Sequence, residues 1–471
     1  MSADRCAPEV TLPHGGRLRG TWDGDLRVFK GIRYAREPAG ALRFEAPVAE
    51  PPWQGVRDAT GFGPPSPQWP RAGSGMLGAL DCLRLNIWAP QASATERLPV
   101  MVWIHGGGFF RGSASDPLYD GASFARQGLV FVSVQYRLGV DGFAHLPDAP
   151  ANRGLLDQLA ALRWVQDCIA AWGGDPGQVT VFGQSAGAGA MACWMGMPAS
   201  QGLLQRAILQ SPSVACQTPE EAHTALRAIA SLAGAAPQRQ ALAEVPLQRL
   251  VHAVHQLAAS PALRRAHGMG SRQFFPLRPV IDGQCLRTDP VQALTQAWQA
   301  RPCPWQLMVG HNAEEMRLYH VPGNGLQRLT QADLQDFIQD AGLPPAPVTD
   351  SPGEQLCALQ SDYYYGQPSR RIAQLASQHA RSVHHYVFQW PSPQWAGMLG
   401  AAHGVELPFV FNSLASATGR ELAGAHAPQP LAARMHAAWA GFARTGNPGW
   451  PAHAGPEPWT ERFDSAGPAS P

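Results

Sequence analysis

Residues 179–190 read VTVFGQSAGAGA, an apolar run followed by a serine between small residues. The apolar run predicts a strand buried on both faces, and the small residues after it predict a helix packed closely on a sheet. Gly183 and Gly187 let the chain turn sharply from strand to helix beside Ser185. This context is typical of a nucleophile elbow, which places the serine hydroxyl at the carboxyl end of a sheet and at a helix N-terminus.

Strand-like runs of the same kind recur along the chain and alternate with helical stretches. Residues 99–105 (PVMVWIH) and 129–136 (LVFVSVQY) are largely apolar, as expected for strands covered by helices on both faces. Apolar residues at helical spacing occupy 153–171 and 431–445. The alternation predicts an α/β fold with a doubly wound, mostly parallel sheet. The other predicted strands are 26–34, 206–210, 306–310 and 384–389.

The composition supports a large buried core, because 45% of the 471 residues are hydrophobic and 15% are charged. The 36 basic and 35 acidic residues give a net charge of +1, which leaves no electrostatic case for binding nucleic acid or an anionic membrane. No run reaches the roughly 18 apolar residues of a membrane span. Residues 1–10 (MSADRCAPEV) lack the apolar core of a signal peptide. We therefore expect a cytoplasmic protein, or a secreted one if a leader has been removed.

The eight cysteines are dispersed along the chain. No two of them form the CxxC pair of a zinc cage, an iron–sulfur site or a thioredoxin-type motif. Several are expected to be ordinary core residues, because a free cysteine packs as a small apolar side chain. We expect neither a metal nor an organic cofactor.

A glycine-rich loop follows the predicted strand 99–105. It begins HGGGFF at His105, and its consecutive glycines leave backbone N–H groups free to point inward without a Cβ in the way. Two such donors and the N–H of Ala186 would form an oxyanion hole. The alternatives are a plain glycine turn or a phosphate loop, and the loop matches neither GxxxxGK(S/T) nor GxGxxG.

A nucleophilic serine needs a base, and the base needs a group that orients it. Of the 16 histidines, His403 stands in a loop of small residues, GAAHG at 400–404, from which its ring can reach over the sheet edge. The acid is expected in a loop after a late strand, and Glu314 and Glu315 follow the strand 306–310. The chain order serine, glutamate, histidine is the one expected beside such an elbow.

A series of ordered motifs extends over most of the chain. They are FKGIRYA (29–35) with LRF (42–44), DCLRLNIW (81–88), HGGGFFRGS (105–113), YRLG (136–139), GQSAGA (183–188), RAILQS (206–211), PVIDG (279–283), HNAEE (311–315) and HGVELPFVF (403–411). Together they resemble the type-B carboxylesterase/lipase family of α/β-hydrolases, which includes the cholinesterases. The resemblance implies a single α/β-hydrolase domain over residues 1–471. It also implies helical insertions over the active site, at about 212–280 and 317–380.

Residue roles follow from the resemblance. It implies that Ser185 is the nucleophile, that His403 is the base, and that Glu315, the second residue of the acidic pair, is the acid. Ser211 matches a buried serine that supports this triad, although it could equally be a plain residue at a strand end.

The resemblance also implies an oxyanion hole and a substrate pocket. Gly107, Gly108 and Ala186 match the donors of the oxyanion hole. Phe109 and Phe275 align near the family's pocket, whereas Met398 is a further candidate that could instead be core packing. The predicted pocket walls are Phe109, Phe275 and Met398.

Two departures from the family pattern bear on chemistry and location. The family usually has Glu before the nucleophile, where this chain has Gln184. The missing carboxylate should lower the stabilisation of a charged histidine and disfavours a cationic, choline-like substrate. Cys82 stands where many eukaryotic members place a disulfide cysteine, yet no cysteine lies between Cys6 and Cys82. The missing partner fits a reducing compartment.

The implied reaction is hydrolysis of a small carboxylic ester through an acyl-enzyme, with short or medium acyl or aryl esters as substrates. A carbamate, amide or thioester hydrolase would use the same triad, and these alternatives stay open at this point. A non-catalytic binding protein on the same fold is the alternative from another class. The sequence leaves open whether the protein is a monomer or a dimer.

Overall fold

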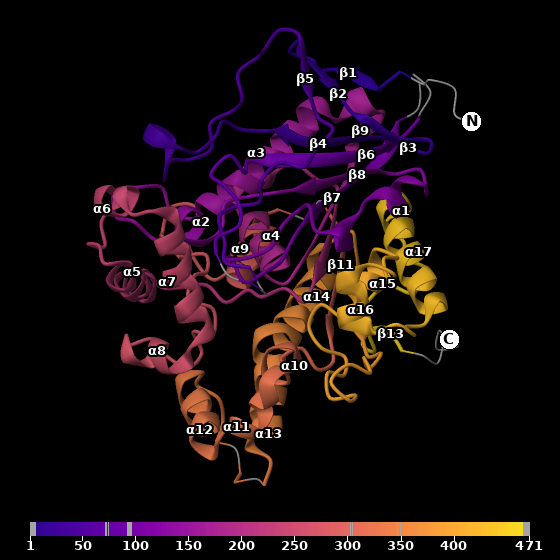
Figure 1. The fold of residues 1–471 in the computed structure, drawn as a ribbon. Coiled ribbons are helices and arrows are strands. Elements are labelled where there is room, and N and C mark those ends of the chain that lie inside the picture. The colour runs from indigo at the N-terminus through magenta and orange to yellow at the C-terminus, as the bar shows by residue number, and fades with distance from the viewer. Residues whose placement is uncertain are drawn as a thin grey trace.

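A ten-stranded, mostly parallel sheet forms the centre of this computed structural model (Figure 1), which describes residues 6–70, 73, 75–91, 97–301, 303, 305–345, 347–348 and 350–464. The strand order is β13-β12-β11-β10-β9-β7-β8-β6-β4-β3. Neighbours from β13 to β8 pair in parallel, and the pairs from β8 to β3 are antiparallel. The strands are β3 (Thr21–Asp23), β4 (Leu26–Arg33), β6 (Arg84–Pro90), β7 (Leu98–Ile104), β8 (Val130–Val134), β9 (Gly174–Gln184), β10 (Arg206–Gln210), β11 (Gln306–Asn312), β12 (Ser382–Phe388) and β13 (Glu461–Phe463).

The seven predicted strand runs all belong to this sheet, and 206–210 coincides with β10. Their continuous apolar character has the expected cause, because both faces are covered. In β7, Val100 and Val102 belong to one core cluster while Met101 and Trp103 belong to another, and all four are fully buried. A second, three-stranded sheet of β1 (Glu9–Thr11), β2 (Arg17–Arg19) and β5 (Val56–Asp58) was not predicted.

Helices cover both faces of the ten-stranded sheet. The first core cluster packs α3 (Arg153–Cys168), α4 (Ala186–Met195), α9 (Pro290–Ala300) and α14 (Gln367–His379) on one face. The second packs α17 (Gln429–Thr445), at the right of Figure 1, on the other face. The predicted helix 431–445 is therefore confirmed. The shorter helices are α1 (Ala122–Ala125), α2 (Gly139–Phe143), α15 (Leu407–Val410) and α16 (Ala417–Ala423).

The two segments predicted as insertions are helical. Residues 212–280 contain α5 (Pro219–Ala233), α6 (Arg239–Glu244), α7 (Leu247–Ala259) and α8 (Pro261–Ala266). Residues 317–380 contain α10 (Arg317–His320), α11 (Gly325–Arg328), α12 (Gln331–Asp340) and α13 (Pro352–Ser361), followed by a π-helical turn and α14. In Figure 1, α12 and α13 project away from the sheet at the bottom. Among the described helices, none has both the length and the apolar character needed to cross a bilayer.

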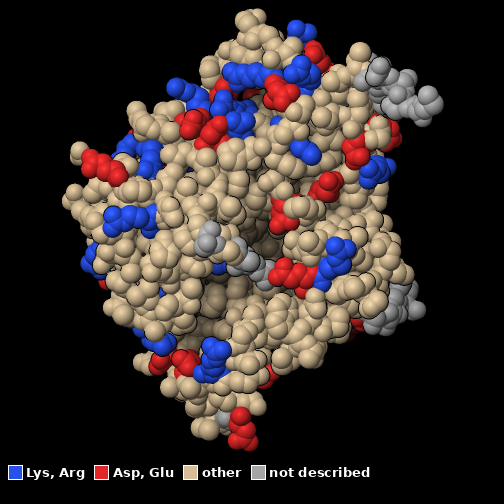
Figure 2. All heavy atoms as spheres, in the orientation of Figure 1, with Lys and Arg blue, Asp and Glu red and all other residues tan. Residues whose placement is uncertain are grey.

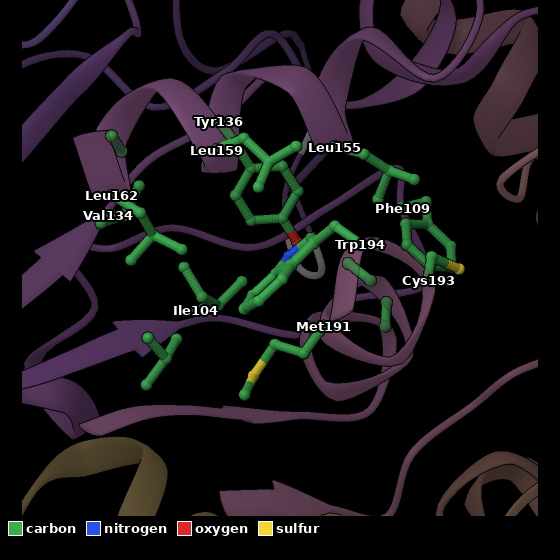
Figure 3. Close-up of a cluster of buried hydrophobic side chains, with 14 of the residues drawn as sticks. Ile104, Phe109, Val134, Tyr136, Leu155, Leu159, Leu162, Met191, Cys193 and Trp194 are labelled. Atoms are coloured by element: carbon green, nitrogen blue, oxygen red, sulfur yellow. The ribbon is translucent and has the colours of Figure 1, made fainter. Parts of the chain in front are cut away.

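Helix α4, which follows Ser185, is buried along its whole length. Figure 3 shows Met191 and Trp194 of this helix packed between α3 and the sheet, near Leu159 and Ile104. The indole N–H of Trp194 donates to the side-chain carbonyl of Gln158 on α3 at 2.9 Å, so the buried donor is satisfied. The small side chains of α4 allow this close packing, which fixes the start of the helix and with it the position of Ser185.

Candidate active site

Ser185 lies at the sharp turn between β9 and α4, as predicted. Its backbone has φ 58° and ψ −125°, an unusual conformation for a residue with a side chain. The backbone is held there because the Ser185 N–H donates to the carbonyl of Gln210 on β10 at 2.9 Å. A Cβ at Gly187 would collide with the carbonyl of Ile104, which explains the glycine two residues after Ser185.

The glycine loop after β7 lies against this turn. A Cβ on Gly106 would be 3.0 Å from the Ser185 Cβ, so the two loops touch. Gly107 has φ 116° and Gly108 has φ 62°, and the backbone curves in a way that L side chains rarely allow. No hydrogen bond among the described residues uses the N–H of Gly107, Gly108 or Ala186. These three donors are therefore available to a ligand.

Glu315 and His403 meet through a short hydrogen bond. Oε2 of Glu315 lies 2.5 Å from Nδ1 of His403, and the carboxylate accepts the ring proton there. The other carboxylate oxygen accepts from the backbone N–H of Asn312 at 2.7 Å. Glu315 is fully buried and His403 is 3% exposed. Both carboxylate oxygens are thus occupied, which fixes the plane of the carboxylate and the orientation of the ring.

Glu314, the neighbouring acid, holds the loop that carries His403. Its backbone N–H donates to the carbonyl of Ala401 at 3.0 Å, and its Oε2 accepts from the Ala401 N–H at 2.9 Å. Arg317 pairs with the other oxygen of Glu314 at 2.8 Å. The two members of the acidic pair therefore have different partners: Glu315 contacts the ring, and Glu314 contacts the backbone two residues before it.

The second nitrogen of His403 faces Gln184 rather than the serine. The amide Nε2 of Gln184 lies 3.1 Å from Nε2 of His403, where the neutral ring can accept an N–H. Ser185 is the next residue, and its hydroxyl makes no hydrogen bond to the described residues. A serine–histidine hydrogen bond often tightens only when substrate binds. Gln184 thus occupies, in this unliganded state, the lone pair to which a serine proton would pass.

A second buried carboxyl, that of Glu406, lies behind the histidine loop. Its Oε2 accepts from the Asn312 side chain at 2.6 Å, and its Oε1 accepts from Gln210 at 3.4 Å. Burial, and then the negative charge of Glu315, raise the pKa of Glu406 to about 7. The Asn312 amide also donates to the Ala402 carbonyl at 2.7 Å, so one side chain ties Glu406 to the histidine loop.

Aromatic rings cover the site. A Cβ on Gly108 would lie 2.8 Å from the ring of Phe275, so this predicted pocket residue borders the glycine loop. Tyr319 packs edge-on against Phe275 at 5.8 Å, and its ring centroid is also 5.8 Å from that of His403. Tyr365 is closer to His403, at 4.5 Å.

The other predicted pocket and supporting residues lie elsewhere. Phe109 belongs to a buried hydrophobic cluster (Figure 3), and its ring packs against Phe143 at 4.7 Å. Met398 is 37% exposed, and its carbonyl accepts from Arg317. Ser211 is fully buried after β10, and its N–H donates to the Gly310 carbonyl at 2.8 Å. Its hydroxyl has no hydrogen-bond partner among the described residues.

Sequence reasoning misses four residues around the histidine: Asn312, Tyr319, Tyr365 and Glu406. For two of them the sequence contains a feature that could have identified them. Glu406 is an acid inside the largely apolar run HGVELPFVF, and Asn312 is the polar end of a buried strand. Tyr319 lies in α10 and Tyr365 lies in the π-helical turn. The position of these two elements over His403 depends on tertiary packing.

The arrangement can polarise a carbonyl group and activate a hydroxyl. It combines three free N–H donors, a serine at a strained turn and a histidine oriented by a carboxylate. The face seen in Figure 2 is hollowed near its centre, and its acidic and basic side chains are scattered around that hollow. No group of three or more potential metal ligands of the His, Cys, Asp and Glu types was found in the described ranges.

Comparisons with known proteins give the family. A model of the carboxylesterase family matches residues 7–342 and 326–467. The para-nitrobenzyl esterase of Bacillus subtilis (strain 168) is 36% identical over 480 residues, covering 94% of this chain and 92% of that protein. The phenmedipham hydrolase of Pseudarthrobacter oxydans is 33% identical, covering 92% and 89%. A solved carboxylesterase structure from Geobacillus stearothermophilus superposes with a TM-score of 0.83 at 34% identity, covering 97% of this chain and 96% of that one.

These likenesses extend over nearly the whole chain and agree with the topology of the ten-stranded sheet. The α/β-hydrolase fold implied by the sequence motifs is confirmed. The chain belongs to the carboxylesterase family and is a carboxylic ester hydrolase.

Proposed function

We propose that Ser185, His403 and Glu315 hydrolyse short- to medium-chain acyl or aryl esters through an acyl-enzyme. The observation that carries the proposal is the 2.5 Å contact between Glu315 and the Nδ1 of His403, beside a serine turn that faces three free N–H groups. The carboxylate keeps the proton on Nδ1, so that Nε2 can accept the serine proton. For this step the Gln184 amide releases Nε2 of His403, and the Ser185 hydroxyl turns toward the same lone pair.

The proposed reaction has two acyl-transfer steps. In the first, Oγ of Ser185 bonds to the ester carbon, its proton passes to Nε2 of His403, and the carbonyl electrons move to oxygen. The N–H groups of Gly107, Gly108 and Ala186 hold that oxyanion. When the ester C–O bond breaks, the leaving alkoxide takes the proton from Nε2. In the second step, water attacks the acyl-enzyme and the same proton transfers release the acid and the serine.

The substrate class is supported by the aromatic wall over the site. Phe275 lies against the glycine loop, and Tyr319 contacts both Phe275 and the ring of His403. Rigid rings at this distance favour a flat or short acyl group over a long flexible chain. The missing carboxylate at position 184 favours a neutral ester over a cationic one. Every step uses side chains and backbone groups of this chain.

The experiment is hydrolysis of p-nitrophenyl esters from acetate to palmitate, with p-nitrophenyl N-methylcarbamate alongside. We expect a short-chain optimum, and a loss of at least about 10⁴-fold in kcat for the folded Ser185→Ala protein. Labelling by a fluorophosphonate identifies the nucleophile by mass. Labelling at another residue would contradict the nucleophile. Labelling at Ser185 without ester turnover, but with carbamate turnover, would move the proposal to that bond.

We also propose that the protein works in a reducing compartment, where its cysteines stay as free thiols. It is tested by counting the thiols that react with a disulfide reagent after unfolding without reductant, where eight are expected. Sedimentation of the folded protein distinguishes a monomer from a dimer.

A further inference from the structure

A second hollow lies at the far end of the elbow helix. It has a volume of about 940 Å³ and is bordered by α3, the C-terminal end of α4, the loops 196–202 and 284–288, and α9. None of Ser185, Glu315 or His403 borders it. Helix α4 has 10 residues, about 15 Å, so this hollow is separated from the serine by the length of that helix. The volume is in the range of sites that hold small organic ligands.

The charge around the hollow has one sign. Its charged residues are Arg163 on α3, Arg287 in the loop before α9, and Arg301 at the end of α9, and no Asp or Glu borders it. All three arginines are exposed, and none makes an ion pair with another described residue. By contrast, the buried Arg137 faces Asp157 at 2.7 Å. The hollow therefore presents uncompensated guanidinium groups, which bind carboxylates through paired N–H donors.

The inner wall is apolar. Leu159 of α3 and Met195 of α4 are buried in it, together with Trp298 and Trp305. The two tryptophans are only 3% and 4% exposed. This wall suits an apolar chain, which is removed from water when it binds there.

We propose that this hollow is a binding site for an amphiphilic carboxylate, an acid with an apolar chain. The guanidinium groups bind the anionic head, and the leucine, methionine and tryptophan side chains contact the tail. The anionic head and the apolar tail of such a ligand each have a counterpart around the hollow. A small inorganic anion would leave the apolar wall in water, and a neutral lipid would leave the three cationic groups without a counter-charge. The site is independent of the proposed catalytic residues.

The test is calorimetric titration of the whole chain with dodecanoate below its micelle concentration, followed in parallel by tryptophan fluorescence. The protein is first labelled with a fluorophosphonate, so that binding in the catalytic pocket does not contribute. We expect saturable binding of one dodecanoate with a change in tryptophan emission. Dodecyltrimethylammonium and acetate serve as probes with the wrong head and without the tail, and neither should bind at the same concentration.

Arginine variants locate the binding. Arg163→Glu combined with Arg301→Glu should weaken dodecanoate at least about 10-fold, because two attractive charges become repulsive. Arg249→Glu, at an exposed arginine of α7 outside the hollow, is the matched control and should bind as the wild type does. Arg287→Gln is a milder second variant and should weaken binding less than the double change.

Three results would overturn the proposal. The first is dodecanoate binding that survives the double variant with its affinity unchanged. The second is equal binding of dodecyltrimethylammonium, which would indicate a purely apolar groove. The third is no saturable binding to the wild-type chain. None of these depends on ester turnover, so they are distinguishable from a failure of the catalytic proposal.

Discussion

The turn after β11 and the turn before α15 each bury a glutamate, and the two differ in what faces them. Glu315 and Glu406 are both fully buried. Asn312 joins them, because its backbone N–H donates to Glu315 and its side-chain amide donates to Glu406. Beyond this shared residue, Glu315 faces the Nδ1 of His403 at 2.5 Å, whereas Glu406 faces the neutral amide of Gln210 at 3.4 Å.

Because both carboxyls are buried, burial alone does not distinguish them. Their different hydrogen-bond partners decide what each carboxyl does. A histidine can become positive during reaction, and a carboxylate beside it is then useful as an anion. An amide stays neutral, so burial and the neighbouring Glu315 charge raise the pKa of Glu406 to about 7. The residue type is the same, and the chemistry expected of each is different.

The largest expected effect comes from neutralising the carboxylate that faces the ring. Glu315→Gln should reduce kcat for p-nitrophenyl acetate by about 10⁴-fold, because an amide does not hold the proton on Nδ1 of His403. Circular dichroism should show a folded protein.

The matched control for that variant is Glu314→Gln. A glutamine oxygen can still accept from the Ala401 N–H, so the loss should stay below about tenfold. Equal losses in the two variants would mean that the acid has been assigned to the wrong member of the pair.

The next effect is on stability and comes from Glu406. Its pKa is about 7 in the folded protein and about 4.5 when free, so the folded state binds the proton more tightly. The resulting stabilisation is complete below about pH 4.5 and is lost as the pH rises through 7. Relative to Glu406→Gln, the wild type should lose about 3 kcal/mol of unfolding free energy over this interval. Urea unfolding at pH 5, 6, 7 and 8 measures it. Parallel curves for the two proteins would show that Glu406 does not titrate there.

Removing the shared residue should disturb both turns. Asn312→Ala deletes the amide that donates to Glu406 and to the Ala402 carbonyl, while the backbone N–H to Glu315 remains. We expect a loss of about 1–3 kcal/mol in unfolding free energy, because a buried carboxyl loses its donor. The decrease in kcat should be smaller than for Glu315→Gln. A fully active variant of unchanged melting temperature would show that the link between the turns has no energetic importance.

The smallest effect sharpens the comparison by placing a second carboxylate at the ring. Gln184→Glu brings a negative charge about 3.1 Å from Nε2 of His403, where it stabilises the protonated ring. The acid limb of the profile of kcat/KM against pH should move upward by about one unit, with little change at the plateau. Gln248→Glu, at an exposed amide of α7, is the control. A limb that does not move would contradict the contact between residue 184 and Nε2 of His403 in the free enzyme.

The fold and the reactive centre follow from the sequence where local and global preferences agree. The run 206–210 matches β10 residue for residue, because an apolar strand covered on both faces has no other place in the fold. Strands β1, β2 and β5 were missed because each has only three residues, and in β1 and β2 only the middle one is buried. Such short segments carry too little periodicity to be recognised.

Contacts that depend on packing were the harder part of the site. Motif order is enough to pair His403 with the turn that carries Glu315. It does not reveal that the amide of Gln184 faces Nε2, or that Tyr365 lies 4.5 Å from the ring. The family resemblance predicts Phe109 as a pocket wall, whereas its φ of 65° accompanies a ring packed against Phe143 in the core.

The backbone conformation at Ser185 also restricts which residues can replace the serine. At φ 58° and ψ −125°, a side chain branched at Cβ would crowd the flanking backbone, whereas an unbranched one fits. Cysteine can therefore replace serine without moving the turn, and threonine cannot, although both carry a nucleophilic atom at the same distance along the side chain. The turn that carries the proposed nucleophile thus limits its possible replacements to unbranched residues, whichever bond the pocket around it comes to select.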